Sequence, residues 1–317
     1  MTAPADSALR QYIEPDFEDE ISWETGIEET ESPRQACRIL VPARQTAPVV
    51  FASPHSGRDY PPDFIAASRL NELTLRRSED AFLDEVFGSA PGRGAPLLCS
   101  EFPRAYVDAN REAFELDPDM FADPLPDYVN TSSPRISAGL GTIAKIVTDG
   151  EDIYHEPLCF EEARKRIETF HRPYHEALKK LLDATLARFG GCLLVDCHSM
   201  PSGAAPHLNG LGQSVDVVLG DCFATACAPA ITNTAQRALE SAGLSVARNK
   251  PYAGGFTTRH YGHPEVGVHV LQVEINRGLY MDEKRIRRGA GMADLTRRIG
   301  LFVSAMAGLD PAILKPA

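Results

Sequence analysis

Residues 190–199, with the sequence Gly-Gly-Cys-Leu-Leu-Val-Asp-Cys-His-Ser, decide the fold class of this chain. They follow residues 160–189, in which apolar side chains recur at helical spacing, and the two glycines end that pattern as C-cap glycines do. A short apolar run then leads directly into polar residues. A helix followed at once by a buried strand is typical of α/β proteins. We therefore predict an α/β fold with a strand at residues 191–196.

The same alternation of apolar runs and amphipathic stretches extends along the chain. It predicts further strands at residues 49–53, 96–100, 216–220 and 268–274, and further helices at residues 78–87, 224–242 and 282–307. Residues 116–152 are instead rich in Pro, Gly, Asp and Ser and form a long excursion. Loops of this length inside compact domains are usually functional, so we expect a lid or a substrate wall here.

Composition divides the chain into two parts. Residues 1–34 are rich in Glu, Asp, Pro and Ser, and their few apolar side chains cannot offset the entropy lost on ordering. We expect them to form an acidic, partly ordered extension. Residues 35–317 have globular composition without a repeat or a linker, and we expect a single catalytic domain.

The charge and the cysteines narrow the class of protein. The net charge of −12 argues against binding to nucleic acid or to an anionic membrane, which requires clustered positive charge. The seven cysteines form no CxxC pair, so we expect reduced thiols rather than a disulfide framework. No signal peptide or long apolar segment is evident, and we expect a soluble, cytoplasmic protein whose oligomeric state is unknown.

Three polar clusters begin where apolar runs end. They lie at residues 53–57, which include His55, at residues 196–199, which include His198, and at Glu274. Because ligands collect at the carboxyl ends of parallel strands, these side chains can converge. Two histidines and a carboxylate are the ligands of a catalytic zinc ion.

The residues leave several assignments open. The carboxylate ligand can be Glu79 or Asp80, and Asp196 is placed to orient a histidine ligand. Glu274 is then free to act as a general base. The alternative is structural, with the histidines anchoring loops by hydrogen bonds and Glu274 forming an ion pair with Arg277.

The other histidines are weaker candidates for a metal site. His171 and His175 lie four residues apart, but no HExxH motif is present and Pro173 separates them. We interpret them as a helix surface with one partly buried histidine. His260 and His263 lie in a glycine-flanked loop, where they are better placed to contact substrate or stabilise an oxyanion.

Asn110 and Arg111 follow a short apolar run and are a candidate carboxylate clamp, because guanidinium groups bind carboxylates through two hydrogen bonds. A surface ion pair of Arg111 with Glu112 or Asp108 is the alternative. Nucleophilic catalysis is disfavoured, since no GxSxG motif occurs and Cys197 and His198 would point to opposite faces of a strand. Nucleotide-binding loops are also absent from the sequence.

Five blocks in order, taken together, resemble the N-formylglutamate amidohydrolase family, which is related to the zinc carboxypeptidases. The blocks are residues 53–57, residues 79–80, residues 107–111, residues 196–199, and residues 254–262 continuing to 272–274. They span residues 49–281. The resemblance implies a three-layer α/β/α sandwich with a mixed sheet, as in the zinc carboxypeptidases.

The family's reaction is the hydrolysis of N-formyl-L-glutamate to formate and L-glutamate during histidine degradation. The resemblance implies one zinc ion, or another divalent metal, bound by His55, Asp80 and His198. Asp80 is preferred to Glu79 because the family block resembles Asp-x-Asp, whose second acid falls on Asp80. Glu274 matches the position of the base in the carboxypeptidases.

The resemblance also indicates how a small anionic N-acyl amino acid would bind. Asn110 and Arg111 match a carboxylate-binding pair, and Arg259 is the expected second clamp, with Arg104 and His260 as further substrate contacts. The chain departs from the family at Ala81, where an aromatic residue is usual, and at Ala109, where a larger apolar residue is frequent. The alternatives are a deacylase or carboxypeptidase for another N-acyl amino acid, and a non-catalytic metal-binding or metabolite-binding relative.

Overall fold

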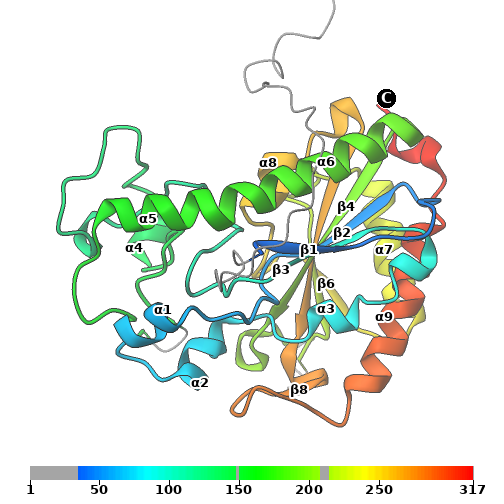
Figure 1. The fold of residues 1–317 in the computed structure, drawn as a ribbon. Coiled ribbons are helices and arrows are strands. Elements are labelled where there is room, and N and C mark those ends of the chain that lie inside the picture. Colours follow the sequence, from blue (N-terminus) through cyan, green and yellow to red (C-terminus); the bar gives the residue numbers. More distant parts are fainter. Residues whose placement is uncertain (1–34, 148–149, 208–213, 317) are drawn as a thin grey trace, which may run out of the picture. The chain divides into compact units, whose positions relative to one another are not determined.

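The computed structural model describes residues 35–147, 150–207 and 214–316 (Figure 1). The extension predicted at residues 1–34 lies outside these residues. Gln35–Ala317 form one compact unit. Among the helices of the described residues, none combines the length and the apolar composition that crossing a bilayer requires.

Seven strands form one mixed sheet in the order β1-β3-β2-β4-β7-β5-β6. Their bounds are Cys37–Leu40 (β1), Val49–Ser53 (β2), Leu97–Ser100 (β3), Cys192–Met200 (β4), Val217–Gly220 (β5), Val246–Arg248 (β6) and Val268–Asn276 (β7). Strands β3, β2, β4 and β7 run parallel, whereas β1 is antiparallel to β3 and β5 is antiparallel to β7. A separate pair comprises Met281–Asp282 (β8) and Arg287–Arg288 (β9).

All five predicted strands are present, but the two central ones are longer than predicted. The parallel pairing of β4 with β7 continues through His198↔Glu274 to Met200↔Asn276. Both functional candidates therefore lie within strands rather than after them. The sequence analysis missed β1 and β6, which are short edge strands whose side chains are mostly half-buried and show no clear apolar alternation.

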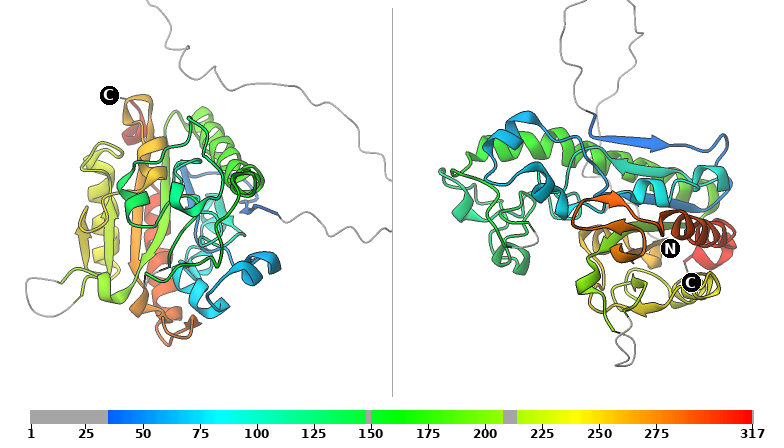
Figure 2. Two further views of the ribbon diagram at one scale, coloured as in Figure 1. Left: turned by 90° about the vertical axis from the view of Figure 1, so that its left-hand side faces the viewer. Right: turned by 90° about the horizontal axis from the view of Figure 1, so that it is seen from below.

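The central strands are buried on both faces, and alternate residues pack into different layers. Leu193, Val195 and Cys197 pack with α3 (Leu83–Val86), α7 (Pro229–Ser241) and α9 (Met292–Ala307). Cys192 and Leu194 pack on the other face with α5 (Phe160–Arg166) and α6 (Arg172–Phe189). The predicted three-layer α/β/α arrangement is confirmed (Figures 1 and 2).

The helix predicted at residues 160–189 is confirmed, with one irregular turn. A π-helical turn at Ile167–His171 joins α5 to α6. Pro173 has no N–H to donate, and the wider turn before it accommodates the missing backbone bond. Gly190 ends α6 in a left-handed conformation, with φ of 74°, and its N–H donates to the carbonyl of Leu186.

The helix predicted at residues 78–87 is wrong for its first half. A 3₁₀ turn ends at Ser78, Glu79 is extended, and α3 begins only at Leu83, after Phe82 with φ of 67°. The reason is a tertiary contact, because the backbone N–H of Asp80 donates to the carbonyl of His55 at 2.9 Å. This bond holds residue 80 beside the end of β2.

The other helices are shorter than predicted or small. Helix α7 begins at Pro229, after a left-handed run at residues 222–224, and α9 begins at Met292, after the β8–β9 pair. The remaining α-helices are Pro62–Ala67 (α1), Glu72–Leu75 (α2), Pro134–Ser137 (α4) and Phe256–Tyr261 (α8). The excursion at residues 116–152 contains α4 and one 3₁₀ turn and is otherwise irregular over its described part.

Candidate active site

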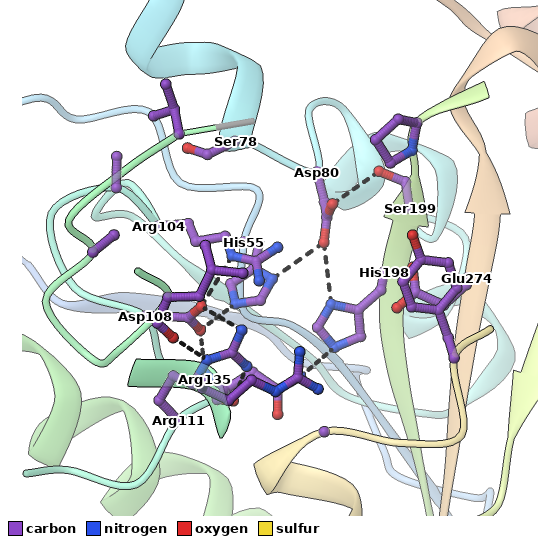
Figure 3. Close-up of a pocket in the computed structure, with 18 of the residues that line it drawn as sticks. His55, Ser78, Asp80, Arg104, Asp108, Arg111, Arg135, His198, Ser199 and Glu274 are labelled. Atoms are coloured by element: carbon purple, nitrogen blue, oxygen red, sulfur yellow. Dashed lines mark hydrogen bonds and ion pairs between the residues drawn. The ribbon is translucent and has the colours of Figure 1, made fainter. Parts of the chain in front are cut away.

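One face of the two central strands changes from apolar to polar along its length. On β4, Cys192 and Leu194 are followed on the same face by Asp196 and His198. On β7, Gln272 and Glu274 take the equivalent positions. His198, Gln272 and Glu274 line a cavity of about 420 Å³, together with His55 from the turn after β2 (Figure 3).

His55, Asp80 and His198 come together as the sequence predicted. Asp80 Oδ2 lies 3.2 Å from His55 Nδ1 and 3.1 Å from His198 Nδ1. All three residues are buried, and one ligand atom from each lies within 4.8 Å of the others. Ligands bonded at ~2.0–2.1 Å to a tetrahedral ion lie about 3.3 Å apart. The cluster therefore has the composition and spacing to bind a metal ion.

In each histidine, Nδ1 faces Asp80 and the other ring nitrogen, Nε2, lies beside a second carboxylate. His55 Nε2 lies 2.8 Å from Asp108 Oδ1, and His198 Nε2 lies 3.0 Å from Asp196 Oδ2. Asp196 is fully buried and has no well-aligned hydrogen-bond partner among the described residues. Carboxylates in this position fix the orientation and tautomer of a metal-binding imidazole. Asp196 thus occupies the place expected from the sequence, and Asp108 takes the same part for His55.

The electrostatics of the cluster suit a cation. Burial opposes a charge on His198, but the carboxylates of Asp196, Asp80 and Glu274 raise its pKa well above the ordinary value. Burial also opposes the ionisation of Asp80, yet hydrogen bonds from His198 and His55 hold the pKa of Asp80 well below its usual range. Negative charge is therefore concentrated where the three ligand atoms meet.

Asp80 is fixed from behind by Arg277. The guanidinium donates at 3.0 Å to Asp80 Oδ1, and the Ser199 hydroxyl donates to the same oxygen at 3.0 Å. Arg277 thus binds Asp80, and among the described residues it forms no ion pair with Glu274. The rival ligand Glu79 forms an ion pair with Arg76 at 3.0 Å and has no bond to either histidine.

Glu274 is buried at the edge of the cluster, on the strand next to His198. The side-chain amide of Gln272 donates to Glu274 Oε1 at 2.8 Å, while Gln272 Oε1 accepts from the N–H of Gly255 at 2.7 Å. Burial raises the pKa of Glu274 to about 7, and the negative charge of Asp80 acts in the same direction. A carboxyl group with such a pKa is suited to accept and return a proton near neutral pH.

Arginines dominate the opposite wall of the cavity. Figure 3 shows Arg104, Arg111 and Arg135 on the same side as Asp108. Arg104 Nε donates to Asp108 Oδ2 at 3.0 Å, and Arg111 NH2 lies 3.6 Å from that oxygen. Five arginines and three carboxylates line the cavity, an excess of two positive charges in a chain whose net charge is −12. The cavity therefore favours an anionic ligand.

Asn110 connects this wall to the histidines. Its Nδ2 atom lies 3.2 Å from His198 Nε2, and its Oδ1 atom accepts from the N–H of Thr257 at 2.8 Å. Gly255 permits this approach, because a Cβ atom there would lie 2.3 Å from Asn110 Nδ2. Asn110 and Arg111 therefore line the cavity as predicted.

Two predicted substrate contacts lie elsewhere. Arg259 is exposed and donates to the carbonyl of Gly254 at 2.9 Å, and it lines a neighbouring hollow of about 590 Å³. His260 is exposed and stacks on Phe256, with ring centroids 4.7 Å apart. Neither lines the cavity of the histidine cluster, because helix α8 presents both side chains away from it.

The interpretation of His171 and His175 as a helix surface with one partly buried histidine fits His175, which is half-buried, but is wrong for His171, which is buried. Their rings lie 4.3 Å apart, and each donates to the loop that bears Asn110. His171 Nε2 lies 2.9 Å from the carbonyl of Arg111, and His175 Nε2 lies 2.8 Å from that of Ala109. The pair thus clamps the loop at residues 109–111.

Three of the cavity residues that the sequence prediction left out are Gln272, Arg277 and Arg135. Gln272 stands two residues before Glu274, so strand periodicity alone places both on one face. Arg277 was considered only as a partner of Glu274. Arg135 gave no signal, because it lies in an irregular segment whose path the sequence does not predict.

Comparison with known proteins identifies similar sequences. A family model described as N-formylglutamate amidohydrolase matches residues 47–281. An N-formylglutamate deformylase of Pseudomonas putida is 30% identical over 239 residues, which cover 74% of this chain and 82% of the relative. An N-formylglutamate deformylase of Pseudomonas aeruginosa is 29% identical, over 82% of this chain and 92% of the relative.

Solved structures share the fold. The crystal structure of N-formylglutamate amidohydrolase from Ralstonia eutropha has a TM-score of 0.80 and 33% identity, over 86% of this chain and 97% of that one. A gene product of Agrobacterium tumefaciens has a TM-score of 0.61 at 18% identity, over 87% of this chain and 97% of that one, and it shows the fold alone.

Proposed function

The chain belongs to the N-formylglutamate amidohydrolase family, and we propose that it is a zinc-dependent enzyme that hydrolyses N-formyl-L-glutamate to formate and L-glutamate. It is a hydrolase that acts on an amide bond. The observation that carries the proposal is the buried His55–Asp80–His198 cluster beside buried Glu274, in a cavity with excess positive charge. The names of the relatives support the substrate. We further propose that the reaction belongs to histidine degradation in the cytoplasm.

We assign the metal site to His55, Asp80 and His198. A bound zinc ion would polarise the amide carbonyl and lower the pKa of a water molecule to roughly 7. Asp108 and Asp196 keep the two imidazoles oriented, and Arg277 keeps Asp80 Oδ2 turned toward them. The three ligands leave a fourth position for water or substrate, as catalytic zinc sites do.

Glu274 transfers the proton in this proposal. The attacking water forms a bond to the formyl carbon and gives one proton to the Glu274 carboxylate. Glu274 returns this proton to the amide nitrogen as the C–N bond breaks, so that formate and the free amino group of glutamate are released. Gln272 holds Glu274 Oε1 and thereby fixes the direction from which the carboxylate approaches.

Asn110, Arg104 and Arg111 are assigned to the α-carboxylate of the substrate. This carboxylate is attached to the carbon next to the scissile nitrogen, so its binding groups must lie close to the metal ligands. Asn110 lies beside His198, and Arg104 is bonded to the same aspartate as His55. With the His198 Nε2 proton directed to Asp196, this nitrogen cannot accept from Asn110, so the amide protons of Asn110 are left for the substrate.

Formate release from N-formyl-L-glutamate tests the proposal. The zinc-loaded protein is expected to release formate, and Glu274→Gln, which cannot accept the proton, is expected to lose ~10²–10⁴-fold in kcat. Glu265→Gln, at an exposed position, serves as the matched control. A panel of N-acetyl and N-carbamoyl amino acids would reveal a deacylase for another substrate. Absence of formate release by the wild-type protein, or full activity in Glu274→Gln, would contradict the proposal.

A further inference from the structure

Arg135 belongs to the excursion at residues 116–152 and lies on the short helix α4. Its side chain lines the cavity of the histidine cluster and also the neighbouring hollow that contains Arg259. It is exposed, whereas Arg111 and Asn110, which line both spaces with it, are buried. Arg135 therefore stands at the outer end of the cavity, where the two spaces meet.

Arg135 forms no ion pair within 4 Å in the described part of the chain, although Glu112 and Glu115 line the neighbouring hollow with it. Arg104 and Arg111 share the carboxylate of Asp108, and Arg277 binds Asp80. The guanidinium of Arg135, in contrast, forms no hydrogen bond or ion pair with any of the described residues. A cation of this kind beside a binding cavity is available to an anion from solution.

Arg135 also adds to a local excess of positive charge. Burial lowers the pKa of Arg111, and the positive charges of Arg104 and Arg135 lower it further, against the effect of Asp108. Arg135 is thus close enough to repel Arg111. An incoming carboxylate placed between these guanidinium groups would remove the repulsion and form charge-assisted hydrogen bonds.

The same excursion supplies the apolar part of the wall. Its residues that line the cavity are Leu140, Ala144, Ile146 and Val147. The carbonyl of Leu140 accepts from Arg111 Nε at 2.8 Å, so this wall is joined to the inner arginines. Methylene carbons of a substrate side chain can pack on these residues while a charged end reaches Arg135.

We propose that Arg135 is a specificity-determining residue that binds the side-chain carboxylate of an N-acyl dicarboxylic amino acid. The inference rests on the proposed function, which places the scissile amide at the histidine cluster and the α-carboxylate at Asn110 and Arg111. In glutamate, the carbon of the side-chain carboxylate lies three carbons from the α-carbon, which bears the α-carboxylate. It therefore extends away from the ligands, toward the outer end of the cavity.

A comparison of two substrates in Arg135→Gln tests the inference. N-formyl-L-glutamine has nearly the shape of N-formyl-L-glutamate but no side-chain charge. Wild type is expected to favour the glutamate substrate, and Arg135→Gln is expected to lower kcat/KM for it by ~10–100-fold while changing the glutamine substrate by less than about threefold. Arg135→Lys should recover part of the preference. Arg93→Gln, an exposed arginine that does not line the cavity, should behave as wild type.

The outcomes separate this inference from the proposed function. If the wild-type protein releases formate from neither substrate, both the proposed function and the role of Arg135 are overturned. Activity in the wild type with an unchanged substrate preference in Arg135→Gln overturns only the role of Arg135. An equal loss on both substrates does the same. Misfolding is excluded by an unchanged melting temperature, which we expect because the guanidinium has no bond to the described residues.

Discussion

The two walls of the cavity are built in different ways. The strand-end wall, defined as His55, Asp80, His198 and Glu274, has side chains from 0% to 6% exposed, and each is bonded to at least one further polar group. The excursion at residues 116–152 contributes Arg135, which is exposed and whose guanidinium forms no hydrogen bond or ion pair with the described residues. It also contributes apolar residues that are buried or half-buried. Reaction geometry is thus assigned to buried residues on strands β4 and β7 and on the segments beside them, whereas the selection of substrate is assigned to an irregular segment.

The largest expected effect comes from removing a ligand on the strand-end wall. His198→Ala should lose both zinc and turnover, because two remaining ligands bind a metal weakly. The loss should exceed the roughly 10–100-fold that follows removal of a residue behind a ligand. Zinc content by elemental analysis and formate release measure it, with His263→Ala at an exposed position as the control. Full activity in His198→Ala would contradict the assignment of His198 as a metal ligand.

The pH dependence of kcat/KM tests the state of Glu274. The base must be deprotonated, so its activity is present above its pKa and is lost as pH falls through it. Burial raises this pKa to about 7, and a bound cation would lower it again. We expect kcat/KM to fall about tenfold per pH unit below an apparent pKa of about 7 or lower. An acidic limb that persists unchanged in Glu274→Gln would exclude Glu274 as the group that titrates.

The strand-end wall was predictable because its signals are short-range. Apolar runs located β2, β4 and β7, and the polar residues on them are separated by the strand period. The position of Asp80 was not predictable from local sequence. Helical spacing favoured a helix at this residue, but the hydrogen bond from its backbone N–H to the carbonyl of His55 holds it in a loop instead. Residue type and position at strand ends indicated the two histidines as metal ligands and Glu274 as the base. The family resemblance selected Asp80 over Glu79 as the third ligand.

The residues outside the strand-end wall were not predictable from such patterns. Arg259 looked suitable because it lies in a glycine-flanked loop, yet helix α8 turns it toward the neighbouring hollow. Arg135 takes a place in the cavity because of how an irregular segment packs, and no periodicity encodes that path. The clamp of His171 and His175 likewise depends on the tertiary contact between α6 and the loop at residues 109–111.

An intermediate effect is expected at Asp108, which joins His55 to the inner arginines. Its Oδ1 atom lies 2.8 Å from His55 Nε2, and its Oδ2 atom accepts from Arg104. Asp108→Asn keeps the shape but removes the negative charge that orients His55 and offsets two arginines. We expect roughly 10–100-fold weaker zinc binding or turnover. Zinc affinity is measured by competition with a chelator, together with kcat. If neither quantity changes in Asp108→Asn, Asp108 does not have this role.

The smallest expected effect belongs to the clamp of the 109–111 loop. His175 Nε2 lies 2.8 Å from the carbonyl of Ala109, which can only accept, so Nε2 carries the proton. Nδ1 then accepts from the Tyr261 hydroxyl at 2.9 Å. Burial holds the pKa of His175 well below its ordinary value, which keeps the ring neutral and the clamp insensitive to pH near 7. His175→Phe removes a neutral hydrogen bond worth about 0.5–1.5 kcal/mol, and should raise KM by ~2–10-fold through displacement of Asn110 and Arg111. Because the ligands are untouched, kcat and zinc content should stay close to wild type. A fall in kcat with KM unchanged would mean that the loop acts on the strand-end wall instead of on substrate binding.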